Sequence, residues 1–113
     1  MSKTKLTKRV LFICSRNRLR SPTAEQVFSL WPDIETDSAG LSADAEPVLA
    51  RDQIDWATII FVMEKRHKHL LTQRFGDALR GKRVICLDIP DNYAFMQAEL
   101  VELLERNVSP YLR

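Results

Sequence analysis

The apolar positions of this chain form short runs that alternate with stretches of helical spacing. Four segments are predicted to be strands, because they are apolar or β-branched and turn-forming residues bound them. They cover residues 10–13, 34–38, 57–63 and 83–87. The remaining pattern predicts four helices, over residues 21–31, 47–54, 64–75 and 94–108.

The first and last predicted helices carry further signals. Ser21 stands before Pro22 and shortly before Glu25, which predicts a helix start with the serine as N-cap. This helix should end before Pro32, because a residue that precedes proline avoids the helical region. The last helix should have one apolar face that packs on the core. This face contains Phe95, Leu100, Leu103 and Leu104.

The alternation of strands and helices predicts the architecture. Such repeats build a parallel sheet through right-handed crossovers. We therefore expect an α/β fold, a three-layer sandwich with a four-stranded parallel sheet and helices on both faces. Ligands of such sheets bind beyond the carboxyl ends of the strands, so the loops after Ile13, Ser38, Met63 and Leu87 should line the site. A chain of 113 residues suits a single domain, with the polar residues 1–7 flexible.

Composition and charge narrow the class of protein. The net charge is +2, from 17 basic and 15 acidic residues, which gives no reason to expect a nucleic-acid partner. No segment approaches the roughly 20 apolar residues that span a bilayer. The apolar stretch after the charged N-terminus, residues 10–14, is shorter than the roughly 7–15 residues of a signal peptide. We therefore expect a cytoplasmic monomer, without a membrane partner, whose two cysteines stay reduced.

The loop between the first strand and the first helix carries the candidate chemistry. Cys14 and Arg20 are separated by five residues, and a loop of this length can curl so that its N–H groups surround an anion. The helix that follows adds its positive end, and the Arg20 guanidinium can hold two phosphate oxygens at once. The same positive field favours the thiolate form of Cys14. These residues predict a phosphate site with a nucleophilic sulfur.

This loop resembles that of the low-molecular-weight protein tyrosine phosphatases. In that family a cysteine, five residues, an arginine and Ser-Pro follow the first strand, and residues 10–25 match this pattern. Weaker matches follow in the same order at residues 37–40 and at residues 87–93, which are similar to the family's late Asp-Pro-Tyr loop. The resemblance implies hydrolysis of phosphotyrosine, in a protein or in a small aryl phosphate, through a cysteinyl-phosphate intermediate. Inorganic phosphate is then a product, and no cofactor is needed.

The resemblance also implies roles for particular residues. Cys14 attacks phosphorus, Arg20 holds the phosphoryl oxygens, and Asp91 protonates the leaving group and later activates water. Ser21 donates a hydrogen bond to the Cys14 sulfur. The residues that bind the substrate are those of the loop: Ser15, Arg16, Asn17, Arg18, Leu19 and Ser21.

Three further residues are expected to support the site: Ser38, Asp88 and Tyr93. Asn17 should adopt a left-handed conformation, which asparagine tolerates, with its side chain fixed by Ser21 and Ser38. Asp88 is the alternative to Asp91 as general acid. Tyr93 either helps to wall the cleft or packs against the core.

The chain departs from the family pattern at several positions. Arg16 stands where the family usually has glycine, Leu19 where it often has a second cysteine, and Asn92 where it has proline. Two alternatives to hydrolysis therefore stay open. One is an arsenate reductase, which would need Cys86 as partner thiol instead of an inert strand residue. The other is a module that binds phosphate or phosphopeptides without turnover.

The predicted helix over residues 64–75 contains two histidines and a cluster of basic residues. His67 and His69 are two positions apart and point in different directions on a helix, so no metal site is expected. The basic residues Lys65, Arg66 and Lys68 are predicted to form a solvated face.

Overall fold

The computed structural model describes residues 7–113, and the flexibility predicted for residues 1–7 falls mainly on residues 1–6, outside this part. The strands are β1 (Lys8–Cys14), β2 (Ile34–Gly40), β3 (Ile59–Val62) and β4 (Arg83–Cys86). They form one sheet in the order β2-β1-β3-β4, and all neighbours are parallel. The four predicted strands are confirmed, with bounds that differ by at most two residues.

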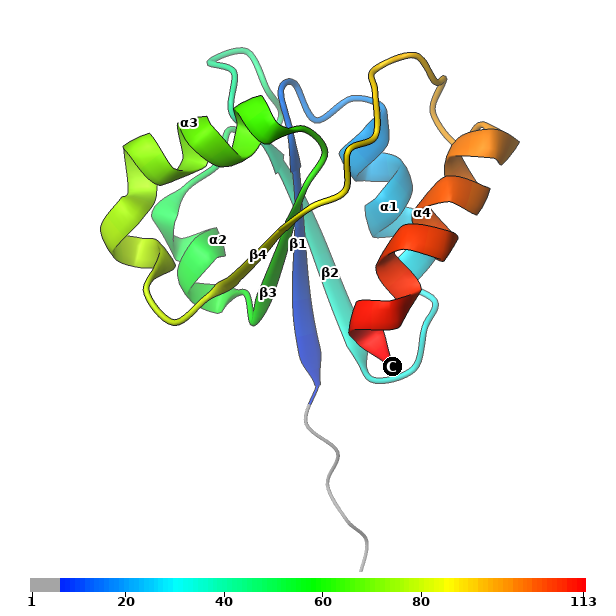
Figure 1. The fold of residues 1–113 in the computed structure, drawn as a ribbon, viewed down its shortest axis with the longest axis horizontal. Coiled ribbons are helices and arrows are strands. Elements are labelled where there is room, and N and C mark those ends of the chain that lie inside the picture. The colour runs from blue at the N-terminus through cyan, green and yellow to red at the C-terminus, as the bar shows by residue number, and fades with distance from the viewer. Residues whose placement is uncertain (1–6) are drawn as a thin grey trace, which may run out of the picture.

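Helices cover both faces of this sheet (Figure 1). α1 (Arg20–Phe28) and α4 (Ala98–Leu112) pack on one face, and α2 (Arg51–Trp56) and α3 (Lys65–Phe75) pack on the other. A 3-10 helix, η1 (Gly76–Leu79), follows α3. The predicted three-layer sandwich with a four-stranded parallel sheet is confirmed.

The central strand β1 supplies both layers of the core, because successive side chains of a strand point to opposite faces. Phe12 packs under α1 and α4, whereas Ile13 packs under α2 and α3. The Phe12 ring stacks between Phe28 and Phe61, with centroid distances of 5.8 and 5.5 Å. Cys14 follows Phe12 by two positions and therefore lies on the α1 and α4 side of the sheet.

The prediction of a helix over residues 47–54 is wrong in its bounds. The Gly40 N–H donates to the Pro47 carbonyl at 3.0 Å, and the Leu49 N–H donates to the Gly40 carbonyl at 2.8 Å. Residues 47–49 thus extend the edge of the sheet beside β2, through a bridge between Gly40 and Val48. Since their backbone groups are paired in this way, the helix begins only at Arg51.

The predicted bounds of the first helix are also wrong. α1 begins at Arg20, so Ser21 lies inside its first turn and is not the N-cap. The helix ends at Phe28 instead of about Trp31, because a tight turn with a hydrogen bond from the Trp31 N–H to the Phe28 carbonyl follows it.

The last helix starts later and ends later than predicted. Met96 has a positive φ of 59°, a conformation that an α-helix does not contain, so α4 begins after it. Phe95, which was predicted to face the core, is 47% exposed because it precedes the helix. Leu100 and Leu104 are fully buried as predicted. None of the helices between residues 7 and 113 is long and apolar enough to cross a membrane.

Candidate active site

The loop of residues 15–19 joins β1 to α1 where the order of the sheet reverses. β2 lies on one side of β1 and β3 on the other, so a crevice opens beyond the carboxyl end of β1. The Leu41 N–H donates to the Cys14 carbonyl at 3.0 Å, and the Ser42 N–H donates to the Ser15 carbonyl at 2.7 Å. These bonds from the segment after β2 hold the start of the loop.

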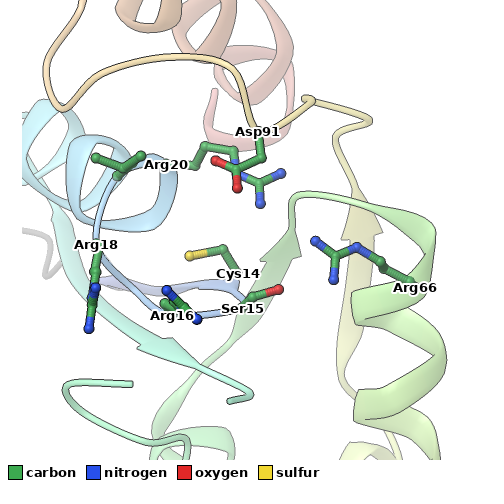
Figure 2. A pocket seen from close by; sticks show the side chains of 8 residues that line it. Cys14, Ser15, Arg16, Arg18, Arg20, Arg66 and Asp91 are labelled. Carbon is green, nitrogen blue, oxygen red and sulfur yellow. The ribbon is translucent and has the colours of Figure 1, made fainter. Parts of the chain in front are cut away.

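A cavity of about 350 Å³ opens over this loop (Figure 2). The residues that line it are Cys14, Ser15, Arg16, Arg18, Leu19, Arg20, Arg66 and Asp91. All of them except Arg66 are residues that the sequence assigns to the site. No aromatic side chain is among them, so the cavity wall combines cationic groups with one aliphatic side chain.

Cys14 lies at the base of the cavity with its sulfur turned towards it (Figure 2). The Asn17 N–H donates to the Cys14 Sγ atom at 3.2 Å. Asn17 adopts the predicted left-handed conformation, with a φ of 58°. This conformation turns a backbone donor onto the sulfur, where it stabilises negative charge.

The predicted side-chain contacts of this loop are wrong. The Asn17 Nδ2 atom donates to the Glu46 carbonyl at 2.9 Å instead of contacting Ser21 and Ser38. The Ser38 hydroxyl faces α1 and donates to the Glu25 carboxylate. The buried Ser21 hydroxyl has no hydrogen-bond partner among the described residues, so the backbone of Asn17, and not Ser21, supplies the donor to the Cys14 sulfur.

Arg20 is only 2% exposed and is held by three groups from distant segments. Its Nη1 atom donates to Glu64 Oε2 at 2.5 Å and to the Ile89 carbonyl at 2.7 Å, and its Nε atom lies 3.8 Å from Asp91 Oδ1. The hydrogen bonds of Arg66 and then of Arg20 to Glu64 lower the pKa of that carboxyl to about 2. The Glu64 carboxylate therefore stays charged and keeps the Arg20 guanidinium in place.

The two candidate acids occupy different places. Asp91 lines the cavity, with its carboxylate facing the Arg20 guanidinium (Figure 2). Asp88 lines a separate cavity and accepts a hydrogen bond from the Cys86 thiol at 3.3 Å. Tyr93 packs against the core under α1 and α4 and is absent from the described lining of the site.

Sequence reasoning missed three site residues at the start of α3: Glu64, which is its N-cap, and Arg66 and His67 in its first turn. His67 is fully buried, and its Nε2 atom lies 3.0 Å from the Ser15 Oγ atom. Arg66 was expected to face solvent, yet it lines the cavity because it bends back onto Glu64. These residues follow β3 directly, so the rule that ligands bind beyond strand ends could have found them.

Cys86 lies apart from Cys14. The Cys86 side chain packs on the α2 and α3 side of the sheet, whereas Cys14 belongs to the opposite side. β4 is separated from β1 by β3, and two strand spacings of about 4.8 Å exceed the usual span of a disulfide. Burial also raises the pKa of the Cys86 thiol. This placement gives Cys14 no partner thiol, which an arsenate reductase would need.

The part of the chain that the structure describes contains no cluster of metal-ligating side chains. Residues 7–113 contain no group of three or more His, Cys, Asp or Glu side chains that could hold an ion.

The loop from Cys14 to Arg20 thus lies where the strand order of a parallel sheet reverses. The fold of this chain is that of the low-molecular-weight protein tyrosine phosphatases. A solved member from Streptococcus pyogenes aligns with a TM-score of 0.73 over 94% of this chain and 91% of that one, at 16% identity. YwlE arginine phosphatase from Geobacillus stearothermophilus aligns with a TM-score of 0.73 over 93% of both chains, at 25% identity. Vibrio vulnificus Wzb, in complex with benzylphosphonate, aligns with a TM-score of 0.74 over 92% of this chain and 96% of that one, at 25% identity.

Sequence comparison points to the same group. The curated protein-arginine-phosphatase of Geobacillus stearothermophilus is 29% identical over 94 residues, which cover 62% of this chain and 64% of that protein. The match therefore spans slightly less than two thirds of the relative's length. No protein-family model matches the chain.

Proposed function

We propose that the chain is a cysteine-dependent phosphatase that hydrolyses phosphotyrosine, or another aryl phosphomonoester, through a cysteinyl-phosphate intermediate. One observation carries the proposal. The Cys14 sulfur lies at the base of a cavity, receives the Asn17 N–H at 3.2 Å, and shares that cavity with Arg20 and Asp91. A nucleophile, a phosphate clamp and an acid are thus within one cavity, which phosphoryl transfer through an enzyme nucleophile requires.

In the first step the Cys14 thiolate attacks phosphorus and forms an S–P bond, while the bond from phosphorus to the leaving oxygen breaks. Asp91 gives its proton to that oxygen, so the alcohol leaves neutral. Arg20 and N–H groups of the loop hold the equatorial oxygens as charge spreads over them.

In the second step water releases the phosphoryl group. Asp91, now a carboxylate, takes a proton from the water as its oxygen bonds to phosphorus. The S–P bond breaks, which restores the Cys14 thiolate and yields inorganic phosphate. A solved variant of YwlE, with serine in place of its active-site cysteine, carries phosphate on that serine, which supports a covalent intermediate here. The proposed enzyme needs no cofactor and acts as a cytoplasmic monomer.

The charge of the cavity bears on the choice of substrate. Arg16, Arg18 and Arg66 stand around Cys14 in addition to Arg20 (Figure 2). A phosphorylated arginine has a cationic guanidino leaving group, which these side chains repel. A phenol carries no positive charge, and its ring can lie against a guanidinium plane. This contrast favours phosphotyrosine, although the curated relative is a protein-arginine-phosphatase.

Steady-state kinetics with paired substrates test the proposal. Wild-type protein should hydrolyse an aryl phosphate, and Cys14→Ala should abolish turnover. Asp91→Ala should slow a phenol with a high pKa by about 10²–10⁴-fold, the usual contribution of a general acid, and slow an activated nitrophenol far less. Full turnover by Cys14→Ala, or equal effects of Asp91→Ala on both phenols, would remove the proposal. Phosphoarginine peptides are the second candidate substrate. A kcat/KM higher for phosphoarginine peptides than for phosphotyrosine peptides would make phosphoarginine the proposed substrate.

A further inference from the structure

Two hydrogen-bond donors line the cavity beside Cys14, one from the loop after β1 and one from the first turn of α3. Ser15 points its hydroxyl oxygen towards α3, and Arg66 extends its guanidinium from α3 towards the cavity (Figure 2). Neither side chain is needed to hold the phosphoryl group over Cys14, because Arg20 and the loop amides supply that clamp. Their function is therefore open.

The proton of the Ser15 hydroxyl is directed by His67. The Glu64 N–H donates to His67 Nδ1 at 3.1 Å, and a backbone amide can only donate, so Nδ1 is the accepting nitrogen. A neutral imidazole then carries its proton on Nε2, which lies 3.0 Å from Ser15 Oγ. Burial, with the nearby charges of Arg66 and Arg20, lowers the pKa of His67 to about 4, so the ring is neutral at pH 7.

It follows that the Ser15 hydroxyl accepts a hydrogen bond from His67 and keeps its own proton free. No other partner of this hydroxyl occurs among the described residues, and Ser15 lines the cavity. The fully buried His67 ring is fixed in the core, so the Ser15 oxygen is held in one place and its proton is available to a ligand.

Arg66 is fixed in a similar way and keeps donors to spare. Its Nε and Nη2 atoms donate to the two oxygens of Glu64 at 3.2 and 3.3 Å. Glu64 also accepts from Arg20, so one carboxylate aligns both guanidinium groups. The Nη1 atom of Arg66 has no hydrogen-bond partner within residues 7–113, and the side chain is 56% exposed to the cavity and solvent.

We propose that the Ser15 hydroxyl and the Arg66 guanidinium form a second anion subsite beside Cys14, which recognises a carboxylate or phosphate on the leaving group of the substrate. The inference rests on the proposed function, because a phosphoryl group at Cys14 is what brings the leaving group to this wall of the cavity. Ser15 and Arg66 touch the substrate, and His67 is a positioning residue. Among the lining residues that the structure describes, Asp91 is the one carboxylate, and four arginines offset its charge.

The substrate class follows from the donors present. A bare aromatic ring offers no acceptor to the fixed Ser15 proton or to the free Arg66 Nη1 atom, so these two donors would add nothing to its binding. A second anion satisfies both, and charge-assisted hydrogen bonds of this kind are the stronger ones. The shared chemistry is an aryl phosphate with an adjacent anion. It can come from a phosphotyrosine next to an acidic side chain or from a small aryl phosphate that carries a carboxylate.

Binding of non-hydrolysable phosphonates to the full chain tests the subsite without turnover. Benzylphosphonate is compared with its meta- and para-carboxylated derivatives by calorimetry at low salt. Wild-type protein should bind at least one carboxylated derivative about tenfold or more tightly than benzylphosphonate, as one charge-assisted contact implies. Arg66→Met should reduce this preference to less than about twofold, and Ser15→Ala should reduce it by about threefold.

Matched controls separate the subsite from folding and from the phosphatase chemistry. Lys68→Met, on the same helix and away from the cavity lining, should keep the full preference. A circular-dichroism spectrum and a urea unfolding midpoint like those of the wild type show that each variant is folded, and the preference is taken as a ratio of affinities within each variant. Equal binding of all phosphonates by the wild type, or an undiminished preference in Arg66→Met, would overturn the subsite. Absence of aryl phosphate turnover with the preference intact would instead contradict the proposed function alone.

Kinetics then identify the source of the anion. The values of kcat/KM for an acidic phosphotyrosine peptide and for a carboxylated phenyl phosphate are measured with wild type and Arg66→Met. The substrate that loses about tenfold or more in the variant is the one that uses the subsite. Loss with neither substrate would count against the inference.

Discussion

Gly40 at the end of β2 is the position where a single methyl group should disturb the phosphate loop most. It pairs with Cys14 in the sheet. A Cβ atom on Gly40 would lie 2.6 Å from the Ser15 carbonyl oxygen and 2.9 Å from the Arg16 carbonyl carbon. It would also lie 2.4 Å from the Ala45 Cβ atom. Since two of these neighbours are backbone atoms of the loop, Gly40→Ala can be accommodated only if the loop moves.

The magnitude follows from the two opposing effects of this substitution. Overpacking of a well-packed site costs about 1–3 kcal/mol. Fewer conformations of the unfolded chain return about 0.4–1 kcal/mol when glycine is replaced at an unstrained position. We expect a net loss of about 1–2 kcal/mol in the free energy of unfolding. Activity should fall more steeply, by about 10²-fold in kcat/KM, because a displacement near 1 Å at the reacting groups has that effect.

Gly76 provides the matched control. No heavy atom lies within 4 Å of a Cβ built there, and its backbone is helical, with a φ of −49°. Gly76→Ala should therefore keep wild-type kcat/KM and gain up to about 1 kcal/mol in stability. Adding Ala45→Gly to Gly40→Ala removes one of the three short contacts but neither backbone contact, so it should restore stability only in part and activity hardly at all.

Two measurements decide the matter: unfolding in urea and the steady-state hydrolysis of an aryl phosphate. A Gly40→Ala variant with the unfolding midpoint and the kcat/KM of the wild type would show that the loop tolerates the added methyl group. Equal loss of activity in Gly40→Ala and Gly76→Ala would show that the loss does not depend on the contacts with the loop.

Two further predictions concern pH and the loop. The pKa of His67 is lowered to about 4 and that of Glu64 to about 2 in the folded protein. Below pH 6.5 the unfolded chain therefore binds more protons than the folded chain, and the free energy of unfolding decreases as the pH is lowered. Urea titrations should show a loss on the order of 2–3 kcal/mol between pH 6.5 and 4 from His67, a further loss from Glu64 between pH 4.5 and 2, and a smaller slope above pH 4 in His67→Gln; a flat profile contradicts this. Asn17→Gly should keep more activity than Asn17→Ala, because glycine adopts the positive φ of 58° without the roughly 1–2 kcal/mol that alanine pays; the reverse order in kcat/KM would rule this out.

The sheet and the loop could be predicted because their signals are local. Buried strands of a parallel sheet are continuous apolar runs, and residues 10–13 and 59–62 have this pattern. The rule for strand ends then assigned the loop after β1 to the site without any knowledge of contacts. The bounds of α2 were missed because they depend on the pairing of Gly40 with Val48, a contact between segments that sequence spacing does not reveal.

The side-chain network around the loop could be predicted only in part. His67 stands among Lys65, Arg66 and Lys68, which were predicted to form a solvated face, yet His67 itself is fully buried against Ser15. Glu64 and Arg66 belong to the site because Glu64 accepts hydrogen bonds from both Arg66 and Arg20. Arg20 lies 44 positions before Glu64, so the sequence does not reveal this contact. Asn17 shows the same limit. Its backbone conformation follows from the residue type, whereas its side-chain partner, the Glu46 carbonyl, depends on how a distant segment folds over the loop.

The central claim is that the Cys14 sulfur carries the phosphoryl group during turnover, and it can be measured directly. Wild-type protein is mixed with an aryl phosphate, quenched in acid within the first turnovers, and its peptides are analysed by mass spectrometry. We expect a single phosphoryl group on the peptide that contains Cys14, and none on that peptide in Cys14→Ala. Turnover at the wild-type rate with every peptide free of phosphate, or with the phosphoryl group on another residue, would contradict it.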